Sequence, residues 1–403
     1  MRFIYNGGMP ELRRHYREVK KVLRKGPRVD SFFVGKYSFS PYQACAHGCL
    51  YCDGRAERYW VEGEFDRDIV IRRNAPEVLA AEVPKLRERG IVFIGSGISD
   101  AYQPPEADER LMPACGRILA DRGLAVTILT KSSLIERDLD LWAEVNGKAG
   151  FLLMVSFMTL DDGLRAVFEP LASSVEKRLE TLRSFKRRGC SIGVAAMPFL
   201  PFLADRDGDF EALSSRLAEI GVDFVLPGGL TLRPGRQKDV FLDALRGAFP
   251  DLAGRYENLY GENRPSGAPR SAYALEQQRR AERTFIRAGI PVVVPHRLYR
   301  GRIPLYDEID VLMDQMTRHY AAREEDLPRL KEALGRYRDW LTARKRVFNR
   351  SRRLHEEDLA GELRELAGSS RWPELLANGK LAGFLREIIV DRRTFEEKTL
   401  RLA

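Results

Sequence analysis

Residues 40–60 read SPYQACAHGCLYCDGRAERYW and contain three of the five cysteines in this 403-residue chain. Cys45, Cys49 and Cys52 are separated by three and then by two residues, so one short loop can bring their thiolates together. The other two cysteines, Cys115 and Cys190, stand alone in ordinary helix and strand contexts, where a buried free thiol is the usual role. This distribution is not a disulfide framework, and we expect thiols that are kept reduced for a metal.

A compact set of three cysteines favours an iron–sulfur cluster. Such clusters usually take four cysteines, so three leave one iron open to another molecule. Structural zinc is the main alternative, but a closed zinc site needs four tetrahedral ligands. His47 is the only nearby candidate for the fourth ligand, and it lies just two residues from both Cys45 and Cys49. Because no cysteine follows Cys190, we expect a single cluster.

The sequence on both sides of this loop has the rhythm of βα units, in which short apolar runs alternate with longer segments of helical spacing. The runs are nearly free of polar alternation, as expected of parallel strands covered on both faces. They predict strands at 32–39, 91–96, 125–130, 151–156, 191–197 and 223–227. About six such units predict an α/β fold with a parallel barrel or partial barrel, although a doubly wound open sheet has the same rhythm.

Two further regions flank the barrel. The basic run RRHYREVKKVLRKGPR predicts a helical extension within residues 1–30, and charge-dense helical stretches predict a helical region over 305–403. The barrel then occupies 31–304, with PVVVP at 291–295 as a further edge strand.

The overall charge favours a polyanionic partner. Lys and Arg number 67 against 58 Asp and Glu, a formal net charge of +9, which suits nucleic acid but is equally explained by solvated arginine-rich helices. No stretch has the length and apolarity of a signal peptide or of a membrane span. We therefore expect a cytoplasmic protein without a membrane partner.

The string ACAHGCLYCDGRAE, with Tyr51 directly before the third cysteine, resembles the signature of the radical S-adenosylmethionine (radical SAM) superfamily. More narrowly, it resembles the branch related to spore photoproduct lyase, often described as DNA repair photolyase-like. The likeness continues over about 40–310, in GSGISDAYQPPE, TKSSLIERDLDLW, FEPLASSVEKRLETL, PFLPFLAD and PHRLYRGRIPLYDE.

The resemblance implies a partial (β/α)6 TIM-like barrel with its active site at the carboxyl ends of the strands. It also implies a 4Fe-4S cluster bound by Cys45, Cys49 and Cys52, whose open iron binds S-adenosylmethionine. One electron from a donor such as flavodoxin or ferredoxin would cleave this cofactor, and the resulting 5′-deoxyadenosyl radical would abstract a hydrogen atom from a substrate.

Polar residues that follow the predicted strands are the expected cofactor contacts. The resemblance implies that Tyr51 packs against the cluster or the adenine, and that Lys131 meets the cofactor's carboxylate or ribose. Ser99, Asp100 and Ser156 could bond its ribose or methionyl groups. Ordinary packing of Tyr51, a lysine reaching solvent and serine or aspartate helix caps remain the alternatives.

Substrate residues are harder to assign. The candidates for contact with the reacting groups are Tyr102 and Glu106, followed by Glu169, Arg178, His296 and Arg297, each of which has an equally good structural role. Spore photoproduct lyases carry a hydrogen-donating cysteine near the end of the second strand, whereas GSGISDAYQ has none. Three functions stay open: a radical enzyme acting on nucleic acid, one acting on a peptide or small metabolite, and a non-catalytic zinc or iron–sulfur module that binds nucleic acid.

Overall fold

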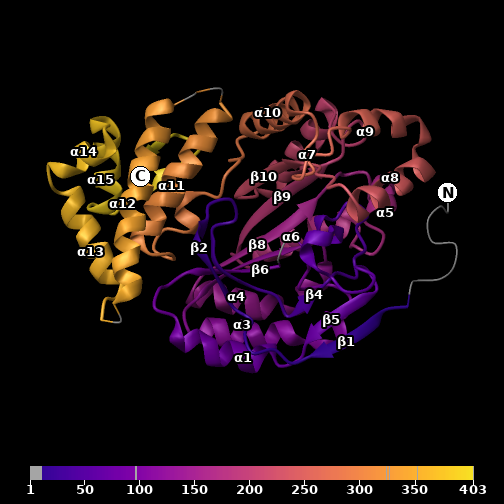
Figure 1. Ribbon diagram of the computed structural model, residues 1–403, viewed down its shortest axis with the longest axis horizontal. Helices are drawn as coiled ribbons and strands as arrows, with labels where there is room; N and C mark the ends of the chain where they lie inside the picture. The colour runs from indigo at the N-terminus through magenta and orange to yellow at the C-terminus, as the bar shows by residue number, and fades with distance from the viewer. Residues whose placement is uncertain (1–10, 96–97, 324, 326, 352, 403) are drawn as a thin grey trace.

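The computed structural model describes residues 11–95, 98–323, 325, 327–351 and 353–402, and it is built around one curled sheet (Figure 1). The sheet contains, in spatial order, β2 (Arg24–Asp30), β3 (Gly35–Phe39), β6 (Ile91–Ile94), β7 (Ala125–Thr130), β8 (Phe151–Phe157), β9 (Ser191–Phe199) and β10 (Phe224–Gly229). The last six strands are parallel, and β2 joins them as an antiparallel edge.

The strands lie side by side in the order in which they occur in the chain. A doubly wound sheet reverses its strand order near the middle, and no such reversal occurs here. The predicted α/β class and partial (β/α)6 barrel are confirmed, and the doubly wound alternative is wrong.

The strands are apolar on both faces because each face packs against a different layer. Along β8, where all seven residues are buried, Leu153 and Val155 pack into the layer beneath the outer helices. Leu152 and Met154 instead join a separate cluster with side chains of β6 and β10, which fills the barrel interior. Ser156 continues the inward-facing series at the carboxyl end, where the interior becomes polar.

Helices cover the outer face of the sheet (Figure 1). They include α1 (Ala75–Glu82), α3 (Leu111–Asp121), α4 (Leu139–Lys148), α6 (Val175–Arg187), α7 (Asp207–Ile220) and α10 (Ser271–Arg287). Helix α6 begins after Ser174, whose hydroxyl accepts the Lys177 amide at 3.4 Å, and it is followed by Gly189 at φ 74°. The serine cap and terminal glycine seen in the sequence therefore bound this helix.

The predicted N-terminal helix is wrong within the described residues. The basic run instead forms β1 (Arg13–Arg17) and β2, and β1 pairs in parallel with β5 (Asp68–Arg72), which also pairs with β4 (Tyr42–Gln43). All five residues of β1 are exposed, and Arg13 forms ion pairs with Asp68 and Glu64. A charged run without an apolar stripe has little to bury as a helix, whereas a strand brings its arginines to these carboxylates.

Residues 291–295 are buried but do not form the predicted edge strand. The carbonyl of Pro291 accepts the amide of Val225 at 2.9 Å, a single bond to the start of β10. The prolines at both ends of PVVVP lack amide donors, so the segment cannot extend a ladder.

The C-terminal part is helical and has its own apolar core. It contains α11 (Leu305–Ala321), α12 (Pro328–Arg350), α13 (Glu356–Ala367), α14 (Arg371–Leu376), α15 (Gly379–Ile389) and a small pair of strands, β11 (Phe395–Glu396) and β12 (Arg401–Leu402). The separate core is in keeping with a boundary near 304/305, which stays a prediction. Within the described part of the chain, no helix is long and apolar enough to cross a membrane.

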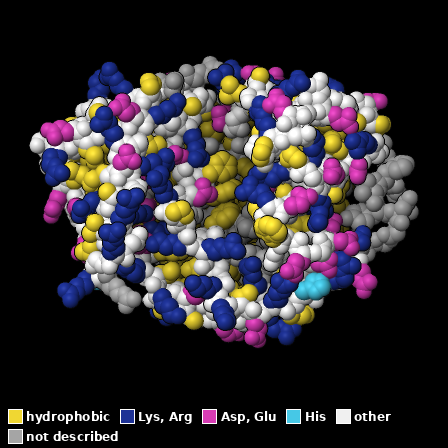
Figure 2. Space-filling model, viewed as in Figure 1, with side chains coloured by type: hydrophobic (Ala, Val, Ile, Leu, Met, Phe, Trp, Pro, Cys, Tyr) yellow, Lys and Arg dark blue, Asp and Glu magenta, His cyan; other side chains and the backbone are white. Residues whose placement is uncertain are grey.

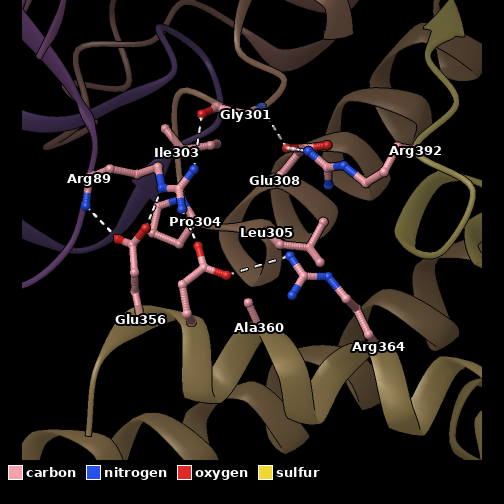
Figure 3. Close-up of a pocket in the computed structure, with 11 residues that line it drawn as sticks. Arg89, Gly301, Ile303, Pro304, Leu305, Glu308, Glu356, Ala360, Arg364 and Arg392 are labelled. Atoms are coloured by element: carbon pink, nitrogen blue, oxygen red, sulfur yellow. Dashed lines mark hydrogen bonds and ion pairs between the residues drawn. The ribbon is translucent and has the colours of Figure 1, made fainter. Parts of the chain in front are cut away.

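Charged side chains line the junction between the barrel and these helices (Figure 3). Arg89, which precedes β6, forms ion pairs with Glu356 and Glu357 of α13, and Arg364 lies 3.6 Å from Glu357. These side chains line a small pocket, which Arg392 and Glu308 also line. Arg392 lies 4.0 Å from the buried Glu308. Since its charged side chains pair with one another, we interpret this pocket as part of the polar contact between the barrel and the C-terminal helices.

Candidate functional site

The three clustered cysteines lie in the loop that leaves the carboxyl end of β3. Cys45 and Cys49 are buried, while Cys52 is partly exposed. Gln103 fixes one side of the loop, because its side-chain oxygen accepts the Ala46 amide at 2.7 Å and its nitrogen donates to the Ala44 carbonyl at 3.1 Å. The loop is therefore held by its backbone, which leaves the thiols available.

A buried guanidinium fixes the other side of the loop. Arg55 donates to the carbonyls of Cys49 and Gly48 at 2.9 and 3.0 Å and forms an ion pair with Asp66. Neither this contact nor that of Gln103 engages a sulfur.

The surroundings of the thiols disfavour bare thiolates. Burial raises the pKa of Cys45 well above its usual value and raises the pKa of Cys49 to about 12. The pKa of Cys52 is also raised by burial. Neighbouring thiolate charge adds to this rise for Cys45 and Cys49, so the sulfurs share one environment. Such thiols need nearby cationic charge, such as bound iron, in order to ionise.

The donor set suits a cluster better than a single ion. The donors are three cysteines of one loop. A zinc site needs its ligands around one point, whereas the cysteines of an iron–sulfur cluster bind different iron atoms. The three thiols therefore fit a 4Fe-4S cluster.

Asp100 ties the cysteine loop to the ends of β6 and β7. Its carboxylate accepts the Thr130 hydroxyl at 2.8 Å and the amides of Lys131 and Tyr102, each at 2.8 Å. The Nδ1 atom of His47 lies 3.3 Å from the same carboxylate. With its oxygens occupied in this way, Asp100 positions the site rather than presenting a free carboxylate to a cofactor.

Tyr51 belongs to a buried chain of polar groups. Its hydroxyl donates to Glu169, which forms an ion pair with Arg178. Arg178 also donates to the carbonyls of Ser156 and Ser173 at 2.7 and 2.8 Å. Burial, together with the charge of Glu169, raises the pKa of Tyr51 well above its usual value, so this phenol stays protonated. Glu169 and Arg178, predicted as substrate candidates, thus hold Tyr51 in place.

Lys131 and Ser156 meet at the carboxyl ends of β7 and β8. The ammonium group donates to the Ser156 hydroxyl at 2.9 Å and lies 5.9 Å from the centre of the Tyr51 ring. Ser156 in turn donates to the Met197 carbonyl at 3.1 Å. Among the described carboxylates, none forms an ion pair with Lys131. This half-buried cation beside the cysteine loop is available to an anionic group.

Other predicted residues lie in separate networks. Tyr102 is fully buried, donates to Asp138 at 3.0 Å and accepts the Trp142 ring N–H at 2.7 Å. Glu106, also fully buried, accepts the amides of Leu111 and Met112 at 3.1 Å and pairs with Arg137. None of these contacts involves Lys131, and a role for Tyr102 or Glu106 in contact with the reacting groups stays a prediction.

Ser99 lies next to the cysteine loop. Its hydroxyl is 3.5 Å from the hydroxyl of Ser40 and 3.5 Å from the side-chain nitrogen of Gln103. Ser96, the neighbouring polar residue after the second strand, lies outside the described residues.

His296 and Arg297 lie away from the cysteine loop. Arg297 forms an ion pair with Asp223, which immediately precedes β10 and therefore marks the amino-terminal end of the barrel. His296 is fully buried and bonds Glu308 at 3.1 Å. The cysteine loop lies at the opposite, carboxyl ends of the strands, so these two residues are not grouped with it.

The comparisons with known proteins agree with this geometry. The family model described as the radical SAM superfamily matches residues 39–212, which contain the cysteine loop, Lys131 and Ser156. A protein of Mycobacterium tuberculosis is 32% identical over 247 residues, which cover 60% of this chain and 72% of the relative. The chain belongs to the radical SAM superfamily.

A second relative shows how far this similarity extends. A protein of Methanocaldococcus jannaschii is 29% identical over 190 residues, which cover 47% of this chain and 70% of the relative. The similarity to that relative therefore spans less than half of this chain.

Solved structures confirm the radical SAM fold. Spore photoproduct lyase with bound AdoMet and dinucleoside spore photoproduct matches with a TM-score of 0.52 at 17% identity, over 68% of this chain and 78% of that chain. Spore photoproduct lyase complexed with dinucleoside spore photoproduct matches with a TM-score of 0.51. The resemblance to the spore photoproduct lyase branch is confirmed at the level of fold.

Membership of the superfamily fixes the class of chemistry. The protein is a radical SAM enzyme, whose family uses a 4Fe-4S cluster and S-adenosylmethionine. Both predicted cofactors are thereby confirmed, while the reaction they serve is left open.

Sequence reasoning missed residues that hold the radical SAM loop. Gln103 and Arg55 bond its backbone from inside, and Gln237 donates to the Tyr51 carbonyl at 3.0 Å from helix α8 (Arg236–Ala248). Gln103 follows β6 and could have been found by extending the search for polar residues after strands. Gln237 has no sequence signal, because its partner is 186 residues away.

Proposed function

We propose that the protein holds a single 4Fe-4S cluster on Cys45, Cys49 and Cys52, cleaves S-adenosylmethionine reductively and abstracts a hydrogen atom from its substrate. The observation that carries this proposal is the meeting of three clustered thiols, two of them buried, with the Lys131–Ser156 pair at the carboxyl ends of the strands. In βα barrels, that end is where reacting groups gather.

Each polar group has a proposed part in cofactor binding. The Lys131 ammonium would bind the carboxylate or a ribose hydroxyl of S-adenosylmethionine. The Ser156 hydroxyl would accept or donate a hydrogen bond to a neighbouring group of the cofactor. Tyr51, held by Glu169, would pack against the cluster or the adenine. Ser99 would offer a hydroxyl near the loop, while Asp100 keeps Lys131 and the loop in register.

When bound, the cluster and S-adenosylmethionine supply one-electron chemistry and a carbon-centred radical. The chain itself has to orient these groups and keep water from them. The buried interior formed by Leu152, Met154 and their neighbours provides that dry floor. Tyr102 and Glu106, proposed from the sequence as contacts of the reacting groups, would on this account shape the wall behind the loop.

We further propose nucleic acid as the substrate class. The support is the net charge of +9 and the structural similarity to a lyase bound to a dinucleoside photoproduct. Figure 2 shows Lys and Arg side chains spread around a hollow with an apolar floor. A groove between β10, α10 and α11 is lined by Leu226 and Val292, with Arg279 and Arg318 also in its lining.

The substrate proposal has a direct test in salt dependence. Binding that releases counterions from phosphates must weaken steeply as salt rises, so affinity for single- and double-stranded oligonucleotides should fall by orders of magnitude between low and moderate salt. If no oligonucleotide binds at low salt, the substrate is a peptide or small metabolite instead.

Reductive cleavage tests the core of the proposal. Anaerobically reconstituted protein, reduced with dithionite, should convert S-adenosylmethionine to 5′-deoxyadenosine, and Cys49→Ala should abolish this conversion. Cys190→Ala is the matched control, because Cys190 is buried in the outer layer of the barrel and should retain the activity. Cleavage by the Cys49 variant, or its absence in both the parent and the control, would exclude the proposed chemistry.

A buried and reduced set of thiols also bears on where the protein works. We propose a cytoplasmic location, since thiols meant for iron survive best in a reducing compartment. There a one-electron donor such as flavodoxin or ferredoxin would reduce the enzyme.

A further inference from the structure

Trp60 is the most exposed large apolar side chain among the described residues, with 85% of its surface accessible. Its backbone is left-handed, with φ 50° and ψ 42°, at the end of the short helix η2 (Glu57–Tyr59). A side chain of this size gains about 2 kcal/mol or more from burial, so a fixed turn that directs it into solvent calls for a partner.

The segment that carries Trp60 begins at the cysteine loop. The three-residue helix η1 (Asp53–Arg55) follows Cys52 directly, and Cys52 is the one cysteine of the set that is partly exposed. A surface pocket is lined by Gly54, Arg55, Trp60, Val61, Phe65 and Arg236. The backbone two residues beyond Cys52 therefore forms part of a surface pocket.

At Gly54, little material separates the cysteine loop from the surface pocket. A Cβ atom at Gly54 would lie 2.6 Å from the Phe65 ring and 3.0 Å from Ile98. The absence of a side chain lets the chain pass directly between the loop and the surface pocket.

Arg58 and Arg236 give this surface an excess of positive charge. Among the described residues, neither side chain forms an ion pair: the Arg58 guanidinium lies over the Tyr59 ring, and that of Arg236 donates to the Gly63 carbonyl at 3.4 Å. Both are exposed. We call Arg58, Trp60, Val61 and Arg236 the Trp60 face.

The carboxylates around the Trp60 face are already engaged. Asp53 pairs with Arg233, Glu62 with Arg17, and Glu64 with Arg13 and Arg67. Glu57 accepts the backbone amide of Arg236 at 2.8 Å. Glu57 keeps its negative charge near Arg236, so the surface offers a partner a small positive excess. Its two guanidinium groups without an ion pair lie beside one exposed indole, a combination that attracts an acidic surface.

The Trp60 face lies on a different side of the cysteine loop from the proposed cofactor pocket. Tyr51 points to Glu169 and approaches Lys131, inside the barrel mouth. The chain after Cys52 instead lies against the start of α8, where Gln237 donates to the Tyr51 carbonyl. The pocket at Trp60 is lined by none of the proposed cofactor contacts, so a protein seated on the Trp60 face need not cover them.

We propose that the Trp60 face docks an acidic one-electron carrier protein of the flavodoxin or ferredoxin class. This inference rests on the proposed function, because it assumes a cluster on the three cysteines. One electron leaves the reduced carrier and enters the cluster near Cys52, so the carrier is oxidised and the cluster reduced by the same electron. No bond forms or breaks at the docking surface, and no proton is exchanged there.

Binding tests the proposal without relying on activity. Oxidised flavodoxin, titrated into the reconstituted enzyme at low salt, should bind the parent protein, and added salt should weaken the affinity because the docking charges are exposed. The double variant Arg58→Glu/Arg236→Glu should weaken binding at least about tenfold, and Trp60→Ala should weaken it by a similar factor. Arg371→Glu, on the exposed face of α14, is the matched charge control and should bind as the parent does.

Two reductants separate docking from chemistry. With reduced flavodoxin as donor, the double variant should form 5′-deoxyadenosine at least about tenfold more slowly at limiting donor. With dithionite, which needs no docking surface, its rate should equal that of the parent. An equal loss with both reductants would overturn the proposal, since the substitutions would then act on the catalytic site.

Other outcomes also decide the matter. If the double variant and Trp60→Ala both keep full affinity for flavodoxin, the proposal is wrong. If the double variant instead loses oligonucleotide affinity and keeps flavodoxin affinity, the Trp60 face is a nucleic-acid surface and the proposal is again wrong. If the parent fails to cleave S-adenosylmethionine with dithionite, the proposed function fails, and the flavodoxin titration still judges the docking surface by itself.

Discussion

The ammonium group of Lys131 donates a hydrogen bond to the hydroxyl of Ser156 at 2.9 Å, across the ends of adjacent parallel strands. The same ammonium group lies 5.9 Å from the centre of the Tyr51 ring, and no carboxylate of the described residues forms an ion pair with it. A cation held by a neutral partner in this way is prepared for an anionic ligand, because binding need not displace a competing carboxylate.

Replacing Lys131 with methionine should weaken S-adenosylmethionine binding by roughly 10- to 100-fold, since a hydrogen bond to a charged group contributes about 1.5–3 kcal/mol. Iron content should not change, because Lys131 contacts no cysteine sulfur through a hydrogen bond. Calorimetric titration of the reconstituted proteins with S-adenosylmethionine measures the affinity of the parent and that of the variant. Lys148→Met, in an exposed pair with Glu144 on α4, is the control. Unchanged affinity in Lys131→Met would remove this residue from the cofactor site.

Tyr102→Phe should destabilise the fold by about 1–3 kcal/mol, because Trp142 and Asp138 both lose a buried hydrogen-bond partner. Formation of 5′-deoxyadenosine should stay close to that of the parent. Urea unfolding and product quantification report the two effects separately. If stability is kept while deuterium return to the substrate is lost, Tyr102 is a hydrogen donor and the structural role is refuted.

Lys36→Met should cost about 3–5 kcal/mol of unfolding free energy, since Glu88 and Asp307 lose the buried cation between them and keep only the more exposed Lys25 and Lys345. Lys36 lies 2.8 Å from Glu88 and 2.6 Å from Asp307 of α11, and all three side chains are about 2% exposed. The bond to Asp307 joins the barrel to the helical region. Denaturant unfolding measures the loss.

Lys25→Met is the matched control for that measurement. Lys25 also pairs with Glu88, but its side chain is 45% exposed, so its loss should cost only about 0–1 kcal/mol. Equal costs for the two variants would show that the buried network does not stabilise the junction.

Glu397 should make the protein less stable as pH rises from about 4.5 to about 7. Burial raises the pKa of this carboxyl to about 7, so the folded state binds its proton more tightly than the unfolded state does. Raising the pH through this window removes that proton and up to about 3 kcal/mol of stability. Glu397→Gln should flatten the dependence while keeping an acceptor for the His296 amide. A pH–stability profile that is the same in the variant would contradict this assignment.

The barrel is predicted well from the sequence because the patterns that indicate its strands and its cysteine loop are local. Apolar runs such as FLLMVS mark strands buried on both faces, and the spacing of Cys45, Cys49 and Cys52 marks one loop. Lys131 and Ser156 lie at the ends of predicted strands and in contact with each other, while their roles in cofactor binding stay predictions. The N-terminal strands were missed, because β1 owes its conformation to pairing with β5, some 55 residues away.

The roles of Glu169 and Arg178 could not be read from the chain either. Both were expected near the substrate, yet the structure shows them holding Tyr51, through a contact that spans 118 residues. In the sequence, a glutamate that binds a ligand cannot be distinguished from a glutamate that accepts a hydrogen bond from a tyrosine. Only the three-dimensional arrangement distinguishes a reacting group from its support.

The most direct test of the account is the iron and acid-labile sulfide content of the anaerobically reconstituted chain, with its electron paramagnetic resonance spectrum recorded before and after addition of S-adenosylmethionine. We expect about four irons and four sulfides per chain, a reduced-cluster signal that shifts with the cofactor, and loss of both in Cys45→Ala, Cys49→Ala and Cys52→Ala but not in Cys115→Ala. Stoichiometric zinc in place of iron, or a cluster that survives loss of any one of the three cysteines, would contradict it.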